Sequence, residues 1–329
     1  MDADHRTGTP VGAVAILGLF VTCSAHAGDL AAFVGGLQSG LSDDPTYAWE
    51  AEYRQPLTEH FVASVAWLNE GHPFNHHRDG QALQLWWSSQ HDGSGLVLDA
   101  GFGPYWSYDS TRPPGSAGAR DVHALGEVAT VAADWNFHSG WFGSLRVNRV
   151  DVHGSFGTTA LEAGGGYRFG QGLALPHLGS DASLDGDPPL FEIDALAGKT
   201  VANSIPAEAA FSEGVGVRAK LSNHFAVSMT YILGTNPPLA WRTGTAAQLW
   251  LEQQLARRFS VGIGVGAFVV TDRSPLANTN MPARLSGLVA IEGAYSISSR
   301  WLARMMWDRI TTADDQDCDI VLVGFGYTF

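Results

Sequence analysis

Apolar and polar residues alternate along most of this chain with a period of two. Residues 47–54 (YAWEAEYR) place two tyrosines, a tryptophan and an alanine on one face, and mainly charged residues on the other. Residues 61–67 (FVASVAW) and 159–169 (TALEAGGGYRF) follow the same scheme. Successive side chains of a β-strand point to opposite faces, so this period is typical of strands with one apolar face. The pattern therefore predicts an all-β protein.

The connections between these strands alternate in length. The longer ones cover residues 39–46, 71–80, 110–120 and 151–156. The shorter ones cover residues 56–59, 91–95 and 136–140. Short turns at one end and longer loops at the other are typical of a transmembrane antiparallel β-barrel. Between residues 30 and 169 we expect about eight strands of about ten residues, which is long enough to cross a bilayer when tilted.

After residues 170–189, which are rich in Gly, Pro and Asp, the pattern begins again and the sequence repeats. The paired segments are 57–64 and 221–228, 84–86 and 248–250, 101–103 and 264–266, and 164–169 and 324–329. All pairs stand 160–164 residues apart and in the same order. A collinear repeat of this kind indicates an internal duplication. We therefore expect two eight-stranded units, 28–169 and 190–329, joined by a periplasmic linker at 170–189.

Two arrangements of the sixteen expected strands are compatible with the duplication. In the favoured one, each copy closes on itself to form two tandem eight-stranded barrels. In the alternative, all strands close into one sixteen-stranded barrel, and residues 170–189 form a long turn. The inward face of the first copy carries several charges, at Glu50, Glu52, Arg54, Asp99, Arg146, Glu162 and Arg168. Buried charges must pair in a narrow interior, so these residues favour two separate barrels filled by ion pairs.

The Gly-x-Gly pairs at 101–103 and 264–266 sit inside predicted strands. No helix is expected to follow them, so they do not fit the context of a nucleotide-binding loop. We expect inward-facing glycines to make room for larger side chains in a tight barrel.

The N-terminus has the pattern of a secretory signal peptide. Residues 11–21 (VGAVAILGLFV) form a short apolar run, and small residues at 25 and 27 precede the expected cleavage site. We predict a signal peptide at residues 1–27 and export through the general secretory pathway. Its removal takes away Cys23 and leaves Cys318, so no intramolecular disulfide is expected. No apolar run in the chain reaches the roughly 18 residues of a transmembrane helix.

Charge and loop composition narrow the expected partners. The formal net charge of −14 argues against nucleic-acid binding, because few cations are available to neutralise phosphates. The loop at 72–79 gathers His72, His76 and His77 beside an aspartate, and imidazole and carboxylate are ligands for zinc. The matching loop at 234–244 has no histidine. We name the three histidines as candidate metal ligands but commit to no metal and no cofactor.

The signal peptide, the alternating strands, the loop asymmetry and the final residues 327–329 (YTF) resemble Gram-negative outer-membrane β-barrel proteins. In that class, a C-terminal strand that ends in Phe is recognised by the barrel-assembly machinery. The resemblance implies a location in the outer membrane of a Gram-negative bacterium, in contact with outer-membrane lipid and lipopolysaccharide. It covers the whole chain after the signal peptide, but it implies a class of protein and no particular activity.

The last two strands of each copy are also distantly similar to those of the lipid A 3-O-deacylase barrels. Those enzymes carry His-x-Ser on the penultimate strand and Glu on the last. In the first copy, Asn148 and Val150 stand at the His and Ser positions, and Glu162 alone matches. In the second copy, these positions hold Asp308, Ile310 and Leu322. The family's catalytic set is therefore incomplete in one copy and missing from the other.

A second His-x-Ser follows in the first copy, at His153 and Ser155. On an extended segment these two residues share a face. A serine nucleophile needs a base within hydrogen-bond reach and a third group that orients the base. Glu162 can be that group only if residues 151–157 form a short hairpin. We name His153, Ser155 and Glu162 as candidate catalytic residues and commit to none.

Arg149 and Arg309 occupy matching positions near the outer ends of strands. Their parity, which they share with Trp141 and Trp301, predicts that both point outward toward lipid. We predict that they reach lipid A phosphates in the outer leaflet. The alternative is a register shift or bulge that turns them inward to pair with acids.

The favoured function is that of a non-enzymatic envelope protein with a structural, adhesive or lipid-contacting role. One alternative is a lipid A acyl ester hydrolase that uses His153, Ser155 and Glu162. A second alternative, passive porin activity, follows only from the sixteen-stranded arrangement.

Overall fold

In the part of the chain that the computed structural model describes, there are sixteen β-strands. It describes residues 28–42, 45–89, 95–112, 120–137, 140–169, 191–203, 209–222, 224–235, 243–271, 284–312 and 317–329. The predicted signal peptide, 1–27, and the predicted linker, 170–189, lie outside the described residues. Within the described ranges, no helix is long and apolar enough to cross a membrane.

The strands fall into two sets of eight. The first set is β1 (Gly28–Ser39), β2 (Thr46–Pro56), β3 (Phe61–Asn69), β4 (His76–Ser88), β5 (Gly95–Thr111), β6 (Arg120–Asn136), β7 (Trp141–Val152) and β8 (Thr158–Phe169). The second set is β9 (Phe191–Ala202), β10 (Ala209–Lys220), β11 (Phe225–Thr235), β12 (Gly244–Ala256), β13 (Phe259–Val270), β14 (Arg284–Ser296), β15 (Trp301–Thr311) and β16 (Cys318–Thr328). The prediction of an all-β protein is therefore confirmed.

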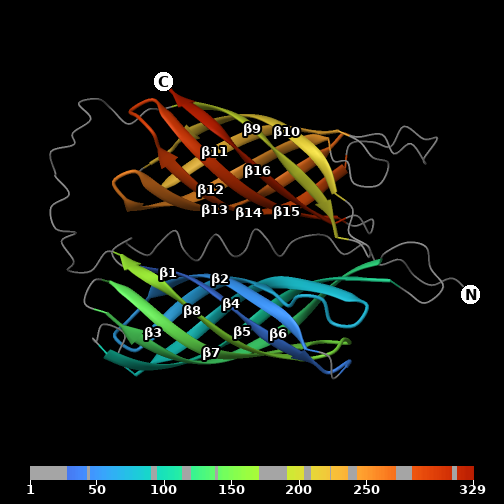
Figure 1. The fold of residues 1–329 in the computed structure, drawn as a ribbon, viewed down its shortest axis with the longest axis vertical. Coiled ribbons are helices and arrows are strands. Elements are labelled where there is room, and N and C mark those ends of the chain that lie inside the picture. Colours follow the sequence, from blue (N-terminus) through green and yellow to red (C-terminus); the bar gives the residue numbers. More distant parts are fainter. Residues whose placement is uncertain are drawn as a thin grey trace, which may run out of the picture.

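Each copy closes into its own antiparallel barrel (Figure 1). In barrel one (β1–β8), β1 pairs with β8, and Val34 lies opposite Ala163. In barrel two (β9–β16), β9 pairs with β16, and Ala197 lies opposite Val323. The predicted pair of eight-stranded barrels is confirmed, and the alternative of one sixteen-stranded barrel is wrong. A single barrel would require β1 to pair with β16, whereas each first strand closes on the last strand of its own copy.

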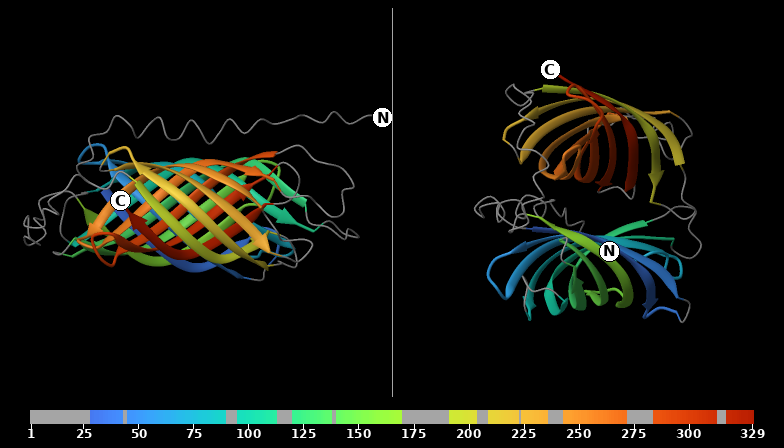
Figure 2. Two further views of the ribbon diagram at one scale, coloured as in Figure 1. Left: turned by 90° about the horizontal axis from the view of Figure 1, so that it is seen from above. Right: turned by 60° about the vertical axis from the view of Figure 1, so that its left-hand side comes forward.

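The two barrels lie side by side, as Figures 1 and 2 show. The β2–β3, β4–β5 and β6–β7 turns lie at the end of barrel one where Gly28 pairs with Phe169. The β10–β11, β12–β13 and β14–β15 turns lie at the end of barrel two where the Phe329 N–H donates to the Phe191 carbonyl. We call this the short-turn end of each barrel and the opposite end the long-loop end.

The short turns repeat one hydrogen-bond pattern in the two barrels. At β2–β3, the Thr58 N–H donates to the Phe61 carbonyl at 3.1 Å. At β10–β11, the Ser222 N–H donates to the Phe225 carbonyl at the same distance. In each turn the side-chain hydroxyl of the Thr or Ser accepts from the Phe N–H, at 3.0 and 3.1 Å. The duplicated sequence therefore forms duplicated local structure.

The side chains sort by polarity in the reverse of a soluble protein. Charged residues such as Arg54 and Arg146 point inward and are 3% and 1% exposed. Large apolar residues such as Phe102, Leu145 and Val323 point outward and are 61%, 53% and 51% exposed. The period of two thus places the buried charges inside the barrels and the exposed apolar side chains outside them.

Two strands of barrel one project beyond their neighbours at the long-loop end. β5 and β6 each have 17 residues, whereas β7 has 12. The pairing of β6 with β7 ends at Gly126 and Val152. Residues 120–125 of β6 continue past that point and pair with residues 106–111 of β5. We call these two segments the raised hairpin.

Candidate functional site

A network of paired charges fills the centre of barrel one. Arg146 donates to Glu50 and Glu52 at 2.7 and 2.9 Å. The side-chain amide of Asn148 donates to both Glu50 and Glu162 at 2.8 Å. These side chains come from β2, β7 and β8, where alternation points them inward. The inward orientation and pairing that the sequence predicts for these charges are confirmed.

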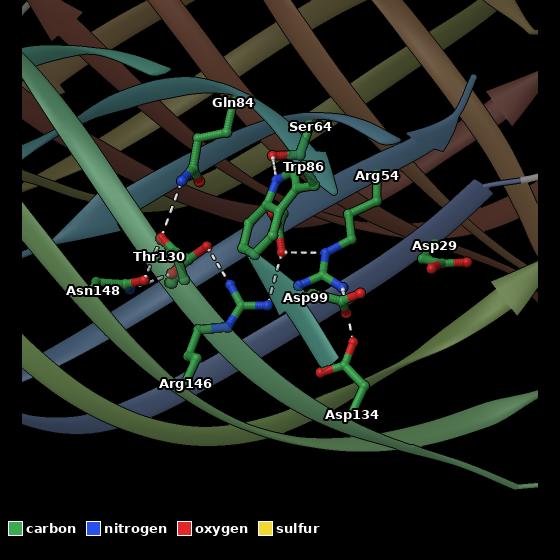
Figure 3. A network of polar contacts seen from close by, with 12 residues as sticks. Asp29, Arg54, Ser64, Gln84, Trp86, Asp99, Thr130, Asp134, Arg146 and Asn148 are labelled. Carbon is green, nitrogen blue, oxygen red and sulfur yellow. Dashed lines mark hydrogen bonds and ion pairs between the residues drawn. The ribbon is translucent and has the colours of Figure 1, made fainter. Parts of the chain in front are cut away.

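Arg54 extends this network toward the short-turn end of barrel one (Figure 3). Its guanidinium lies 2.8 Å from Glu52, 2.8 Å from Asp134 and 3.6 Å from Asp99. The same guanidinium lies over the Trp86 ring, with its central carbon 4.5 Å from the ring centroid. Buried charges of this kind are stable only as pairs, so each acid and arginine depends on the other.

A second network closes barrel one near its long-loop end. Arg78 donates to the two Glu70 carboxylate oxygens at 2.9 and 2.6 Å and to the Phe156 carbonyl at 2.8 Å. Glu70 also accepts from the Tyr105 hydroxyl at 2.7 Å and from the Thr158 hydroxyl. Arg78 and Tyr105 are both fully buried. The network therefore joins β4, β5 and β8 across the interior.

Most charges inside barrel two gather in its short-turn half, whereas Asp308, which accepts from Gln248, lies nearer the long-loop end. Arg218 contacts Glu252 at 2.6 Å and Glu292 at 2.5 Å. Arg304 contacts the other oxygen of Glu292 at 2.5 Å and Glu192 at 2.5 Å. Glu292 is thus shared between two arginines, and the network ties β9, β10, β12, β14 and β15 together.

One three-residue arrangement occurs in both interiors. Its members are Arg54, Ser64 and Trp86 in barrel one and Arg218, Ser228 and Trp250 in barrel two, each pair 164 residues apart. In both barrels the indole N–H donates to the serine hydroxyl at 2.8 Å. The arginine lies over the indole ring at 4.5 Å in barrel one and 4.6 Å in barrel two. The duplication therefore kept the core of the interior as well as the strands.

A glycine faces each of these tryptophans from the neighbouring strand. Gly101 pairs with Trp86, and Gly264 pairs with Trp250. A Cβ atom at Gly101 would lie 2.5 Å from the Trp86 ring, and one at Gly264 would lie 2.8 Å from the Trp250 ring. Real Cβ atoms do not approach so closely, so each indole occupies the space that its glycine leaves. This agrees with the prediction that inward glycines make room in the barrel.

The three candidate catalytic residues face different surroundings. His153 lies exposed on the outer surface at the β7–β8 turn, where its Nδ1 is 2.8 Å from the Leu125 carbonyl oxygen. Ser155 lies in the same turn. Glu162 is buried inside the barrel and accepts from Asn148. These contacts direct the base outward and the acid inward, so the hydrolase hypothesis gains no support from the geometry.

The three candidate metal ligands also have different partners. The His72 and His77 rings stack with centroids 4.6 Å apart. His76 turns the other way along β4, and its Nδ1 lies 2.9 Å from Asp109. Among the residues that the structure describes, no group of three His, Cys, Asp or Glu side chains is placed to hold a metal ion.

The two arginines that the sequence pairs have different environments. The Arg149 side chain is 51% exposed and pairs with Asp151 of the same strand at 2.5 Å. Arg309 is 1% exposed, and its Nη2 lies 3.0 Å from Asp79 of barrel one. Both side chains occupy outward positions of their own strands, as the parity predicts. Arg309, however, faces the other barrel, so it is not available to a lipid phosphate in this arrangement.

Sequence reasoning missed the cluster around Arg309. Asp79 and Asp317 lie beside this arginine at the long-loop end, at 3.0 and 3.8 Å. One signal was present in the sequence. Asp79 shares the outward-facing register of Leu85 and Trp87 in β4, and a carboxylate is unusual among lipid-facing residues.

No protein-family model and no curated protein matches this chain. Several solved barrels are similar to one copy. The N-terminal β-barrel domain of Pseudomonas aeruginosa OprF is 13% identical, with a TM-score of 0.36, and the match covers 44% of this chain and 98% of that chain. Ail, the attachment invasion locus protein of Yersinia pestis, is 9% identical, with a TM-score of 0.33 and coverage of 44% and 96%.

Two further structures extend this comparison. Neisserial surface protein A is 10% identical, with a TM-score of 0.35, and the match covers 44% of this chain and 96% of that chain. The monoaromatic hydrocarbon channel CymD is 11% identical, with a TM-score of 0.24 and coverage of 92% and 89%. Similarities at this level carry no argument about activity, and the fold assignment rests on the strand pairing of this chain.

Proposed function

We propose that this protein is a pair of closed outer-membrane barrels with a structural, adhesive or lipid-contacting role and without enzymatic activity. One observation carries the proposal, namely the reversed sorting of polarity. The charged side chains inside both barrels are buried and form ion pairs, whereas many large apolar side chains face outward and are exposed. Such a molecule is suited to a bilayer, because lipid tails cover an apolar exterior that water would not.

The exposed apolar surface extends over both barrels. In barrel one it includes Val34, Leu98, Phe102, Val131 and Leu145. In barrel two it includes Val215, Val217, Met229, Val323 and Phe325. Soluble monomers rarely expose continuous apolar patches larger than a few hundred Å². Repetition of the same surface on two barrels supports the burial of both in one membrane.

Aromatic side chains gather at the short-turn ends. Trp141 and Tyr167 meet edge to face in barrel one, with centroids 5.1 Å apart. Trp301 and Tyr327 do the same in barrel two at 5.0 Å, and Phe329 contacts Tyr327. Aromatic rings prefer the boundary between lipid tails and water. This supports a membrane boundary at the short-turn ends, which we assign to the periplasmic side.

The filled interiors support a closed protein. An eight-stranded barrel is just wide enough for its own inward side chains. In barrel one, Arg146 and Arg78 bridge the interior at two levels. In barrel two, Arg218 and Arg304 bridge it at one level. The porin alternative rested on a sixteen-stranded barrel and loses its basis.

Export, membrane partners and source belong to the same proposal. The sequence supports export through the general secretory pathway, insertion by the barrel-assembly machinery and a Gram-negative outer membrane. Arg149 remains the residue that we assign to lipopolysaccharide contact. It is exposed on the outward face near the long-loop end, where its charge can reach a lipid phosphate.

Membrane fractionation combined with conductance measurements tests the closed-barrel function. We expect the full chain in the outer-membrane fraction, with the heat-dependent gel mobility of a folded barrel. Purified protein in planar bilayers should give no single-channel steps above the protein-free control. Recovery in the soluble fraction, or steady channel openings, would contradict the proposal.

Lipid analysis tests the lipid-contacting role and the absence of hydrolysis. We expect Arg149→Gln to reduce the lipopolysaccharide that co-purifies with the protein, and Arg149→Lys to retain it because the charge remains. Mass spectrometry should find the same lipid A with and without the protein. Loss of a 3-linked acyl chain would instead establish the hydrolase.

A further inference from the structure

An oppositely charged pair connects the lipid-facing surfaces of the two barrels. Arg309 shares its face of β15 with Met305, which is 57% exposed. Asp79 shares its face of β4 with Leu85, which is 54% exposed. Arg309 and Asp79 are nevertheless each 1% exposed, and they form an ion pair of 3.0 Å with one another. This pair joins an outward charge of one barrel to an outward charge of the other.

Further polar groups of both barrels surround this pair. Within barrel two, the Arg309 guanidinium lies 3.4 Å from Asp319 and 3.8 Å from Asp317. From barrel one, Tyr108 of the raised hairpin presents its ring 5.8 Å from the same guanidinium. One buried arginine thus contacts both barrels at once.

Asp317 makes two more bridges to the raised hairpin. Its Oδ2 lies 2.9 Å from His123 Nε2, and its N–H donates to Asp121 at 2.9 Å. Burial by itself would raise the pKa of the Asp317 carboxyl, but the hydrogen bond from His123 and the charge of Arg309 hold this pKa below its usual value. The ionised carboxylate is therefore the form that the contact stabilises.

Aromatic residues continue the contact below the charges. Trp307 of β15 meets Trp67 of β3 edge to face, with centroids 4.9 Å apart, and approaches Trp49 at 6.3 Å. Trp67 is 4% exposed on an outward-facing position and stacks on Tyr108. Between lipid-facing surfaces, packing and polar contacts decide association, because lipid tails are as apolar as the side chains.

The duplicated sequence shows that the two copies have diverged in a complementary way. Arg149 of copy one has Asp151 two residues later, whereas the matching position after Arg309 is Thr311. Arg309 therefore has no acid two residues later on its own strand, and its acidic neighbours are Asp319 and Asp317 of barrel two and Asp79 of barrel one. Conversely, copy one has Asp79 where copy two has Thr243.

From these observations we infer that the two barrels are docked to one another, and that the Arg309–Asp79 ion pair fixes them in one parallel orientation. The interface joins unlike faces, β3 and β4 with the raised hairpin on one side and β15 with the start of β16 on the other. Unlike faces can form open chains of subunits if each unit carries both. Here barrel two has Thr243 in place of the acid, and Arg149 of barrel one is held by Asp151. The association therefore ends at two barrels.

All of these contacts lie at the long-loop ends of both barrels. The barrels consequently point the same way, as two barrels in one membrane must. This inference concerns the contact between the barrels, and it stands apart from the closed, lipid-contacting role proposed above.

Cleavage of the linker tests the docking directly. A protease site placed within 170–189 allows the two halves of the folded full-length protein to be separated in detergent, with an affinity tag on the C-terminal half. We expect the untagged half to remain bound to the tagged one. If the two halves separate once the linker is cut, the inference is wrong.

Matched substitutions identify the ion pair as the cause. Arg309→Met and Asp79→Leu suit lipid-facing positions, so both should keep the heat-dependent mobility of folded barrels and yet release the untagged half. Arg149→Met, at the duplicated position, should leave the halves together. If the two halves of folded Arg309→Met stay bound after cleavage, the ion pair does not hold the barrels together. If one of the two variants fails to fold, the other still tests the role of the ion pair, because the substitutions lie in different barrels. Membrane fractionation tests the proposed function separately.

Discussion

The interiors of the two barrels agree at one end and differ at the other. In their short-turn halves, both hold an arginine over a tryptophan with buried carboxylates around it. At the long-loop end, barrel one holds the charged network of Glu70 and Arg78. Barrel two fills the same region mainly with apolar side chains, namely Ile232, Phe268, Leu288, Ile310 and Ile320, and Asp308 lies beside them.

The difference shows which part of the duplicated unit is constrained. The shared core of Arg, Ser and Trp lies against a glycine that leaves room for the indole, so each member restricts the others. The outer half has a weaker requirement, which is to fill a narrow interior without leaving a charge unpaired. Ion pairs and apolar packing both meet that requirement, so the copies were free to diverge there.

The largest expected effect comes from removing an arginine that serves several buried acids. Arg304→Leu leaves Glu192 and Glu292 short of a partner, and should destabilise barrel two by about 3–5 kcal/mol. Arg146→Leu should do the same to barrel one. Urea titration of the full chain, followed by the gel mobility of each half after linker cleavage, measures the two barrels separately. A single shared loss of both barrels in either variant would contradict their separate closure.

The charged network of Glu70 and Arg78 in barrel one can be replaced by apolar packing of the kind found in barrel two. Arg78→Leu alone leaves Glu70 buried without its cation and should cost barrel one about 3 kcal/mol. The double variant Glu70→Leu/Arg78→Leu removes both charges and should recover most of that loss. The urea midpoint of barrel one is the measurement. Equal destabilisation of the single and double variants would show that the network of Glu70 and Arg78 does more than fill the interior.

The glycines beneath the tryptophans should respond alike in the two copies. Gly101→Ala and Gly264→Ala place a Cβ against the indole, and each should destabilise its barrel by about 1–3 kcal/mol. The effect should be larger at Gly101, where the approach is 2.5 Å rather than 2.8 Å. Urea midpoints of the two barrels compare them directly. Unchanged urea midpoints would mean that the indole can adopt another conformation without loss of stability.

The smallest expected effect is the loss of the serine that accepts from each indole. Ser64→Ala and Ser228→Ala remove one hydrogen bond of 2.8 Å in each barrel. Each should destabilise by about 1 kcal/mol. The two values should agree, because the geometry is the same in both copies. A clear difference between them would show that the shared core is no longer equivalent.

The fold could be predicted because it depends on periodicity and repetition, both of which are written along the chain. Alternation at 47–54 falls within β2, and the inward charges that it selects, such as Glu50 and Arg54, are buried and paired. The repeat of 164–169 at 324–329 marks the closing strand of each barrel. A closed barrel follows from local patterns of this kind.

The contact between the barrels could not be predicted in the same way. Parity correctly turns Arg309 outward, but it cannot say that another barrel, rather than lipid, lies beyond the side chain. The partner, Asp79, belongs to the other copy. The matching position in barrel two holds Thr243, so the repeat gives no second acid that would point to this contact. The side-chain set of His153, Ser155 and Glu162 shows a related limit, since spacing alone does not reveal which side of the barrel wall each residue occupies.

Cysteine crosslinking across the barrel seams tests the central claim, that each copy closes on itself. Val34 and Ala163 are opposed outward residues at the β1–β8 seam, and Ala197 and Val323 are opposed at the β9–β16 seam. Paired residues on adjacent strands lie within reach of a disulfide. In a background that lacks the native cysteines, and after cleavage within 170–189, we expect both of these pairs to oxidise while the halves remain covalently separate. A disulfide between cysteines at Val34 and Val323 that joins the two halves would show a single barrel and contradict the claim.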